Sequence, residues 1–254
     1  MPLFYCSSRL ESWQSSRKNS SIARSPPFLR KGFYRFLINN SDLCQKESID
    51  LVIIIISKPS SYKTRDAIRR TWASGKNLGI DLSINVKFFF LLDFDEKLSQ
   101  QIRLENELFQ DLIQVELPQH YTLVTHRVLS LFEWSFRFCR TAKYLFKTDD
   151  DIFINIILLL KLAQPLVNEP VDNSFSISDM HMYGYRYDNP AVFRTATEAT
   201  QTRYIVTKEE FPCYYYPSFL SGFGYLISRK ARDAIVYTAY QDPEPFRVSD
   251  VYLT

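Results

Sequence analysis

The chain has 254 residues, of which 46% are hydrophobic, and it includes 20 Phe and 16 Tyr. This composition excludes a disordered protein and suffices for one α/β domain with a large core. Residues 1–40 hold seven Lys or Arg and one acidic residue, so the formal net charge of +3 conceals a net charge of −3 over the remainder. A basic body that could grip nucleic acid is therefore excluded.

Residues 1–48 are rich in Ser, Arg and Pro and show no sustained periodicity. They are predicted to form a poorly ordered basic tail before a folded domain of residues 49–254. The tail lacks the apolar core of a signal peptide, and no apolar run approaches the roughly 18 residues that indicate a membrane helix, so we expect no anchor in this chain. Four cysteines allow three complete pairings, and the sequence leaves the choice open.

The first half of the domain alternates strand and helix patterns. Residues 51–56 form a continuous apolar run, typical of a strand covered on both faces. Further strands are predicted at residues 86–92, 112–117 and 144–148, and helices at residues 62–73, 96–110 and 122–140. This alternation predicts a mainly parallel sheet flanked by helices, in which ligands bind beyond the carboxyl ends of the strands.

The second half is less regular. We expect a short buried helix at residues 156–163, strands at 203–207 and 225–228, and a helix at 229–240. Residues 165–200 have mixed polarity and include the aromatic run 183–187, which is left without an assigned element. Such a half suits substrate-binding loops and antiparallel edge strands added to a nucleotide-binding half.

Three consecutive carboxylates, Asp149, Asp150 and Asp151, follow the fourth predicted strand. A divalent cation relieves their mutual repulsion, and carboxylate oxygens suit hard ions such as Mg²⁺ or Mn²⁺. The alternative is an acidic turn whose last Asp caps the following helix. The position at the carboxyl end of a strand favours a binding site.

Three stretches together resemble the β-1,3-glycosyltransferase family of galactosyl- and N-acetylglucosaminyltransferases. They are residues 65–72 (RDAIRRTW), 147–155 (KTDDDIFIN) and 216–225 (YPSFLSGFGY). Order and spacing fit from about Asp50 to the last residue, and several motifs in order are more specific than one triplet. The resemblance implies a GT-A type fold, with a Rossmann-like sheet and a less regular acceptor-binding half.

The same resemblance implies an inverting, Mn²⁺-dependent hexosyltransferase. Its donor would be UDP-galactose or UDP-N-acetylglucosamine, and its acceptor a glycan on protein or lipid, joined in β-1,3 linkage. Members of the family are Golgi membrane proteins whose catalytic domain faces the lumen, so membrane association is expected for a full-length member.

By resemblance, Asp151 ligates the metal directly. Asp149 and Asp150 contact ribose, sugar or metal-bound water, and Asp149 is counted with the metal site. Asp250 is expected to be the general base for the acceptor hydroxyl, because inversion requires a base on the face opposite the leaving group. The alternative is an ordinary surface Asp.

Four further residues are candidates for donor binding. Arg65 and Arg69 lie four residues apart on one predicted helical face, where they form either a clamp for phosphate oxygens, a solvated face or an ion pair with Asp66. Gly222 and Gly224 lack the spacing of a phosphate loop and allow either close approach of a donor sugar or a strand kink. None of the three histidines is assigned to a metal.

Three features depart from the family pattern. The membrane anchor is missing, the chain stops at Thr254 before the family's C-terminal end, and the family's Glu-Asp-Val motif is Ser249-Asp250-Val251. We therefore expect a fragment, an alternative transcript or an incomplete gene model. The alternative function is a catalytically inactive relative that binds sugars or partner proteins. A phosphohydrolase is disfavoured, because no nucleophile-type Asp motif follows the first strand.

Overall fold

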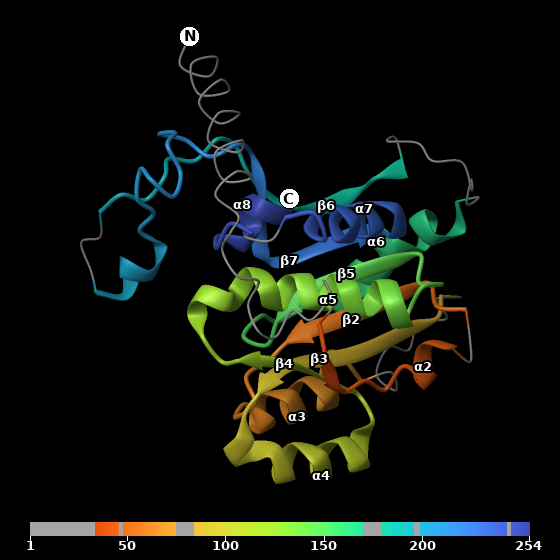
Figure 1. Ribbon diagram of the computed structural model, residues 1–254. Helices are drawn as coiled ribbons and strands as arrows, with labels where there is room; N and C mark the ends of the chain where they lie inside the picture. The colour runs from red at the N-terminus through yellow and green to blue at the C-terminus, as the bar shows by residue number, and fades with distance from the viewer. Residues whose placement is uncertain (1–33, 46–47, 75–83, 170–178, 196–198, 243–244) are drawn as a thin grey trace.

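The computed structural model describes residues 34–45, 48–74, 84–169, 179–195, 199–242 and 245–254. These residues form a seven-stranded sheet in the order β1-β4-β3-β2-β5-β7-β6 (Figure 1). The strands are β1 (Phe36–Ile38), β2 (Leu51–Ile56), β3 (Val86–Phe94), β4 (Leu112–Pro118), β5 (Tyr144–Asp149), β6 (Met182–Tyr187) and β7 (Phe219–Ser228). The helices are α2 (Asp42–Gln45), α3 (Tyr62–Arg70), α4 (Ser99–Phe109), α5 (Val124–Phe138), α6 (Ile156–Asn168), α7 (Arg229–Ala239) and α8 (Ser249–Leu253).

The centre of the sheet is parallel and its edges are antiparallel. Strand β2 pairs in parallel with β3 and β5, and β3 pairs in parallel with β4. The edge strands β1 and β6 run antiparallel to their neighbours, and so does β7, which lies between β5 and β6. Strand β2 can occupy the centre because its first five side chains are all fully buried. The predicted mainly parallel α/β architecture is confirmed, and it is consistent with a GT-A type fold.

Helices cover both faces of the sheet. Alternate residues of β2 separate into two cores: Val52 and Ile54 face the layer of α5, α7 and α8, whereas Leu51, Ile53 and Ile55 face the layer of α3, α4 and α6. Figure 1 shows α5 on one side of the sheet and α3 and α4 on the other. The continuous apolar run of β2 therefore follows from burial on both faces.

The second half of the chain differs from its prediction. The strand expected at residues 203–207 is wrong, because residues Ala199–Tyr204 form a 3₁₀ helix. Strand β7 begins at Phe219, six residues before the expected start, and the unassigned aromatic run belongs to β6. The outer half of β6 is exposed, and glycines interrupt β7 at positions 222 and 224, so neither segment shows a regular apolar alternation.

Residues 34–45, which we placed in the tail, instead pack on the domain. Strand β1 pairs with β4, the buried backbone N–H of Tyr34 donates to Glu133 Oε1 at 2.9 Å, and a disulfide joins Cys44 to Cys139. A three-residue strand gives too short a pattern to be recognised from sequence. Residues 1–33 and 46–47 of the predicted tail lie outside the described residues.

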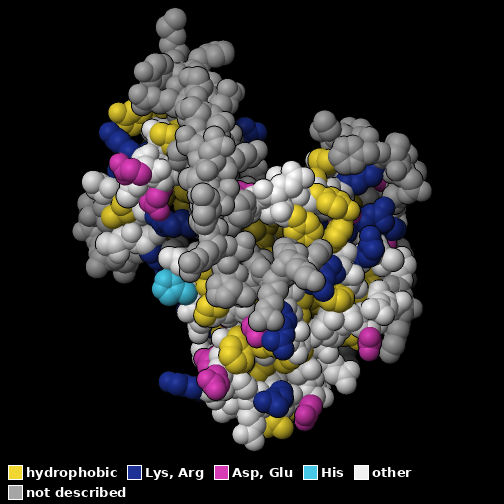
Figure 2. Space-filling view, viewed as in Figure 1, with side chains coloured by type: hydrophobic (Ala, Val, Ile, Leu, Met, Phe, Trp, Pro, Cys, Tyr) yellow, Lys and Arg dark blue, Asp and Glu magenta, His cyan; other side chains and the backbone are white. Residues whose placement is uncertain are grey.

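The surface mixes charged and hydrophobic side chains on the face shown in Figure 2. Exposed aromatic rings gather where β6 meets β7: the ring of Tyr185 lies 5.1 Å from that of Tyr187 and 6.2 Å from that of Phe223, measured between centroids. Within the part of the chain that the structure describes, none of the helices has the length and apolar character needed to cross a membrane.

The disulfide is expected to be a main source of stability. It closes a loop of 95 residues and thereby restricts the unfolded chain. Replacing Cys139 with Ala should lower the free energy of unfolding by about 2–5 kcal/mol, measured by denaturant titration. The variant lacking both Cys44 and Cys139 should match the single variant, whereas parent-like stability of either variant would contradict the prediction.

Candidate active site

The acidic triplet lies where β2 and β5 end side by side. Ile56 of β2 is opposite Asp149 of β5, and the backbone N–H of Asp150 donates to the carbonyl of Ile56 at 3.0 Å. Successive side chains of a strand point to opposite faces. Accordingly, Asp149 contacts Lys147 on its own strand, whereas Asp150 contacts Ser57 after β2. Asp151, the next residue, is exposed.

A buried lysine holds Asp149 next to β7. Lys147 is only 3% exposed, and its Nζ donates to Asp149 Oδ1 at 2.7 Å and to the carbonyl of Gly222. The sequence reasoning missed Lys147. Its signal is a lysine within an apolar strand, because a buried ammonium group requires an acceptor or a counter-charge.

Asp250 reaches the same place from α8. Its Oδ2 accepts the backbone N–H of Gly222 at 2.8 Å, and its Oδ1 accepts the hydroxyl of Ser249 at 3.0 Å. The tertiary structure thus joins Asp149, Gly222 and Asp250, which are separated by up to 101 positions in the sequence. The hydroxyl of Ser249 orients the carboxylate, a contact that sequence reasoning did not foresee.

Negative charge accumulates at this site. Burial raises the pKa of Asp149, Lys147 offsets part of that rise, and the charges of Asp151 and Asp250 raise the pKa further. Three carboxylates therefore act on one region at the carboxyl end of β5. Although the described residues contain no ready-made group of three His, Cys, Asp or Glu ligands, a Mg²⁺-type site needs only one or two carboxylates, with phosphate and water completing the shell.

The two glycines of β7 have different neighbours. A Cβ at Gly222 would lie 2.3 Å from Asp250 Oδ1, so the carboxylate fills the space that a side chain would need. A Cβ at Gly224 would meet Phe146 Cζ at 3.2 Å, a tight but less severe contact. The lack of a side chain at Gly222 therefore lets Asp250 reach β7. This explains the glycine in a way that differs from the two considered from sequence, close approach of a donor sugar and a strand kink.

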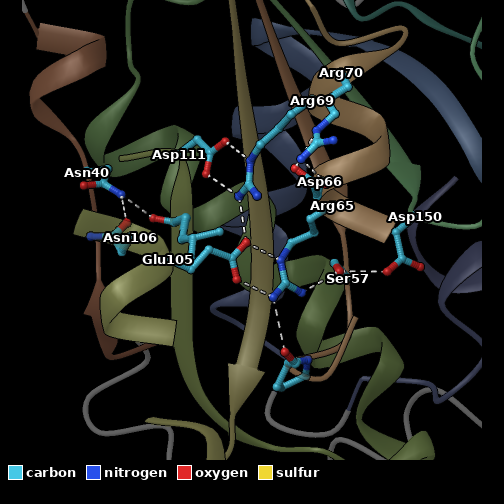
Figure 3. Close-up of polar contacts among 12 residues, drawn as sticks. Asn40, Ser57, Arg65, Asp66, Arg69, Arg70, Glu105, Asn106, Asp111 and Asp150 are labelled. Carbon is cyan, nitrogen blue, oxygen red and sulfur yellow. Dashed lines mark hydrogen bonds and ion pairs between the residues drawn. The ribbon is translucent and has the colours of Figure 1, made fainter. Parts of the chain in front are cut away.

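Arg65 and Arg69 lie in the interior of the domain. Arg65 is fully buried and pairs with Glu105 at 2.6 Å, and Arg69 pairs with Glu105 at 2.8 Å and with Asp111 at 2.7 Å (Figure 3). Asp66 pairs with Arg70 instead. Buried ion pairs therefore occupy the groups that we considered for a phosphate clamp.

The partner Glu105 was missed in the sequence. It follows Ile102 by three residues on the helix face that contacts the core, and only 4% of Glu105 is exposed. A carboxylate at a core-facing position of an amphipathic helix requires a cation. That pattern is the signal that identifies Glu105 as a paired residue.

We expect Gly222→Ala to destabilise the domain more than Gly224→Ala does. The new methyl group at position 222 must displace Asp250, which should lower the free energy of unfolding by about 1–3 kcal/mol. Gly224→Ala is the matched control, because its methyl group meets the end of a phenylalanine ring. Chemical denaturation measures both. Equal stabilities would mean that Asp250 does not depend on the space at position 222.

Comparison with known proteins agrees with the arrangement of the fold. The family model described as Galactosyltransferase matches residues 63–254. A lactosylceramide 1,3-N-acetyl-β-D-glucosaminyltransferase of Xenopus tropicalis is 30% identical over 214 residues, which cover 82% of this chain and 53% of that protein. UDP-GalNAc:β-1,3-N-acetylgalactosaminyltransferase 1 of Mus musculus is 30% identical over 234 residues, covering 89% of this chain and 65% of that protein.

The chain spans between about half and two thirds of the length of these relatives. The family match nevertheless covers most of the chain, including the 147–155 motif, Gly222 and Asp250. It begins after Ser57 and includes Lys147, Asp149 and Ser249, which contact one another or Gly222 and Asp250 at this site. This chain is therefore a member of the galactosyltransferase family, with similarity to its β-1,3-glycosyltransferases.

Proposed function

We propose that this protein is an inverting β-1,3-glycosyltransferase that moves galactose or N-acetylglucosamine from a UDP-sugar to a glycan. The observation that carries the proposal is the convergence of Asp149 and Asp250 on the Lys147–Gly222 contact at the carboxyl ends of the strands. The family match and the similarity to named β-1,3-glycosyltransferases support it.

The carboxylates of Asp149 and Asp151 fit a hard divalent cation such as Mn²⁺. Burial raises the pKa of Asp149, the charge of Asp151 raises it further, and a cation would relieve the repulsion between the two carboxylates. When bound, such a cation supplies a Lewis acid for the phosphate oxygens of the donor. Asp151 would be the direct ligand, since it is the most exposed of the triplet. Lys147 keeps Asp149 in place through a 2.7 Å contact.

Asp250 would act as the base. Its carboxylate accepts the proton of the acceptor hydroxyl while the hydroxyl oxygen bonds to the anomeric carbon of the donor sugar. The bond from that carbon to the diphosphate breaks, and its electron pair leaves with UDP. The N–H of Gly222 and the hydroxyl of Ser249 hold the carboxylate in one orientation without neutralising its charge.

The acceptor is proposed to be a glycan on lipid or protein. One similar protein is named for lactosylceramide, a glycolipid. The exposed rings of Tyr185, Tyr187 and Phe223 offer apolar surface next to Gly222 for a sugar ring. The Cys44–Cys139 disulfide favours an oxidising compartment, which supports action on the lumenal side of the Golgi membrane.

A catalytically inactive family member is the second candidate, because Ser249 stands where the family has Glu. The contact from Ser249 to Asp250 supports the active alternative, since the carboxylate still receives a hydrogen bond. Sugar transfer in a single-turnover assay with a panel of UDP-sugars separates the two. Metal-dependent UDP binding without transfer to any acceptor would favour the inactive member.

Donor binding should depend on the metal. Asp151→Asn removes the charge of the proposed direct ligand and should weaken UDP binding in Mn²⁺ by about 10²-fold, measured by calorimetry. Excess chelator should have the same effect on the parent protein. Lys161→Gln, at an exposed position of α6, is a control that should leave binding unchanged. Tight UDP binding in the presence of chelator would contradict the proposal that a metal is required for donor binding.

Catalysis should depend on Asp250 without donor affinity changing. Asp250→Asn keeps the size of the side chain but cannot accept the hydroxyl proton, so kcat should fall by about 10²–10⁴-fold. UDP binding should remain within about threefold of the parent, because the proposed metal ligands are unchanged. A variant that transfers sugar at the parental rate would exclude Asp250 as the base.

A further inference from the structure

The guanidinium of Arg65 has all five N–H donors directed at acceptors. Nε and Nη2 donate to the carboxylate of Glu105 at 2.8 and 2.6 Å, and Nη2 also donates to the carbonyl of Pro59 at 3.2 Å. Nη1 donates to the hydroxyl of Ser57 at 3.0 Å and to the carbonyl of Lys58 at 2.6 Å. One buried side chain thus fixes the loop after β2 against α4.

Ser57 passes this constraint to the acidic triplet. Its hydroxyl accepts from Arg65, and its single proton is donated to Asp150 Oδ2 at 2.7 Å, the shorter of its two donor contacts (Figure 3). A hydroxyl that accepts from a cation is a stronger donor, because hydrogen bonds in a chain polarise one another. Asp150 is therefore held at both its backbone N–H, by Ile56, and its carboxylate.

The other end of the network is held by Arg69 and Asp111. Arg69 donates to Glu105 at 2.8 Å and to both oxygens of Asp111, and its guanidinium lies over the rings of Phe90 and Phe109. Although burial disfavours its charge, Arg65 and Arg69 lower the pKa of Glu105, which therefore remains an anion between two cations. Glu105 and Arg65 have one favourable arrangement, and Arg65 holds the loop of residues 57–59 in place through its contacts with Ser57, Lys58 and Pro59.

We propose that Arg65 and Ser57 are positioning residues for Asp150, which orient its carboxylate for the nucleotide-sugar donor. The inference rests on the proposed function. Without the hydroxyl of Ser57, the Asp150 carboxylate would lose the hydrogen bond that stabilises its charge near Asp149 and Asp151. The Asp150 side chain would then sample other rotamers. The ion pairs of the α3 arginines thereby take part in donor recognition through Ser57 and Asp150.

Ser57 gives the sharpest test, because a small side chain can be changed without unpairing a buried charge. Ser57→Ala should weaken UDP binding in Mn²⁺ by about 10–100-fold and raise the KM for the donor, with kcat changed less. Ser57→Thr retains a hydroxyl and should restore binding to within a few-fold. Arg70→Gln, on the same helix as Arg65 but in an exposed ion pair, is the control and should bind as the parent does.

Coupling between the residues completes the test. If Ser57 acts through Asp150, Ser57→Ala should have little further effect on UDP affinity in an Asp150→Asn background. Parental affinity of Ser57→Ala, or additive effects of the two substitutions, would overturn the proposal.

A parent protein that fails to bind UDP with Mn²⁺ would instead contradict the proposed function. The contact itself would then be measured by the same double-mutant cycle on the free energy of unfolding, where additivity would overturn the link from Ser57 to Asp150.

Discussion

The parallel pairing of β2 with β5 is the constraint on which the site depends. Both strands end at the same edge of the sheet, and their register sets Ile56 beside Asp149. The next residue of each chain segment then completes the arrangement, because Ser57 donates to Asp150. Because successive side chains alternate between faces, consecutive carboxylates are divided between two environments. Lys147 stabilises the charge of Asp149 on one side. Ser57, which accepts a hydrogen bond from Arg65, stabilises that of Asp150 on the other.

The antiparallel strand β7 supplies the second half of the site. Its pairing with β5 brings the carbonyl of Gly222 within reach of the Lys147 side chain, and the missing side chain at Gly222 leaves room for Asp250. A carboxylate from the last described helix thus reaches residues of a central strand. In the proposed reaction, this geometry links Asp149 at the metal site to the base Asp250, because Lys147 contacts both Asp149 and Gly222 and Gly222 contacts Asp250.

Buried charges connect the site to the helix layers. Isolated charges are costly in the interior, but Arg65, Glu105, Arg69 and Asp111 neutralise one another in a chain of short contacts. Removing Glu105 would take the only carboxylate of this set from Arg65, and removing Arg69 would take the cation from Asp111, so the four residues act as a connected unit. Such a unit has one favourable geometry, and this property suits it to hold the loop that carries Ser57.

The sequence alone determined the alternating α/β half, because continuous apolar strands and amphipathic helices have periods that are visible locally. It also identified Asp149, Asp151 and Asp250 as candidates, through charge spacing and family resemblance. Only the tertiary structure decided that residues 34–45 join the sheet, that β7 and β6 extend it beyond β5, and that the α3 residue Arg65 is buried in an ion pair. These features depend on pairing between distant segments, such as Cys44 with Cys139 or Arg65 with Glu105. No local pattern encodes which distant partner will neutralise a charge or complete an edge, because that choice is made by the packing of the whole chain.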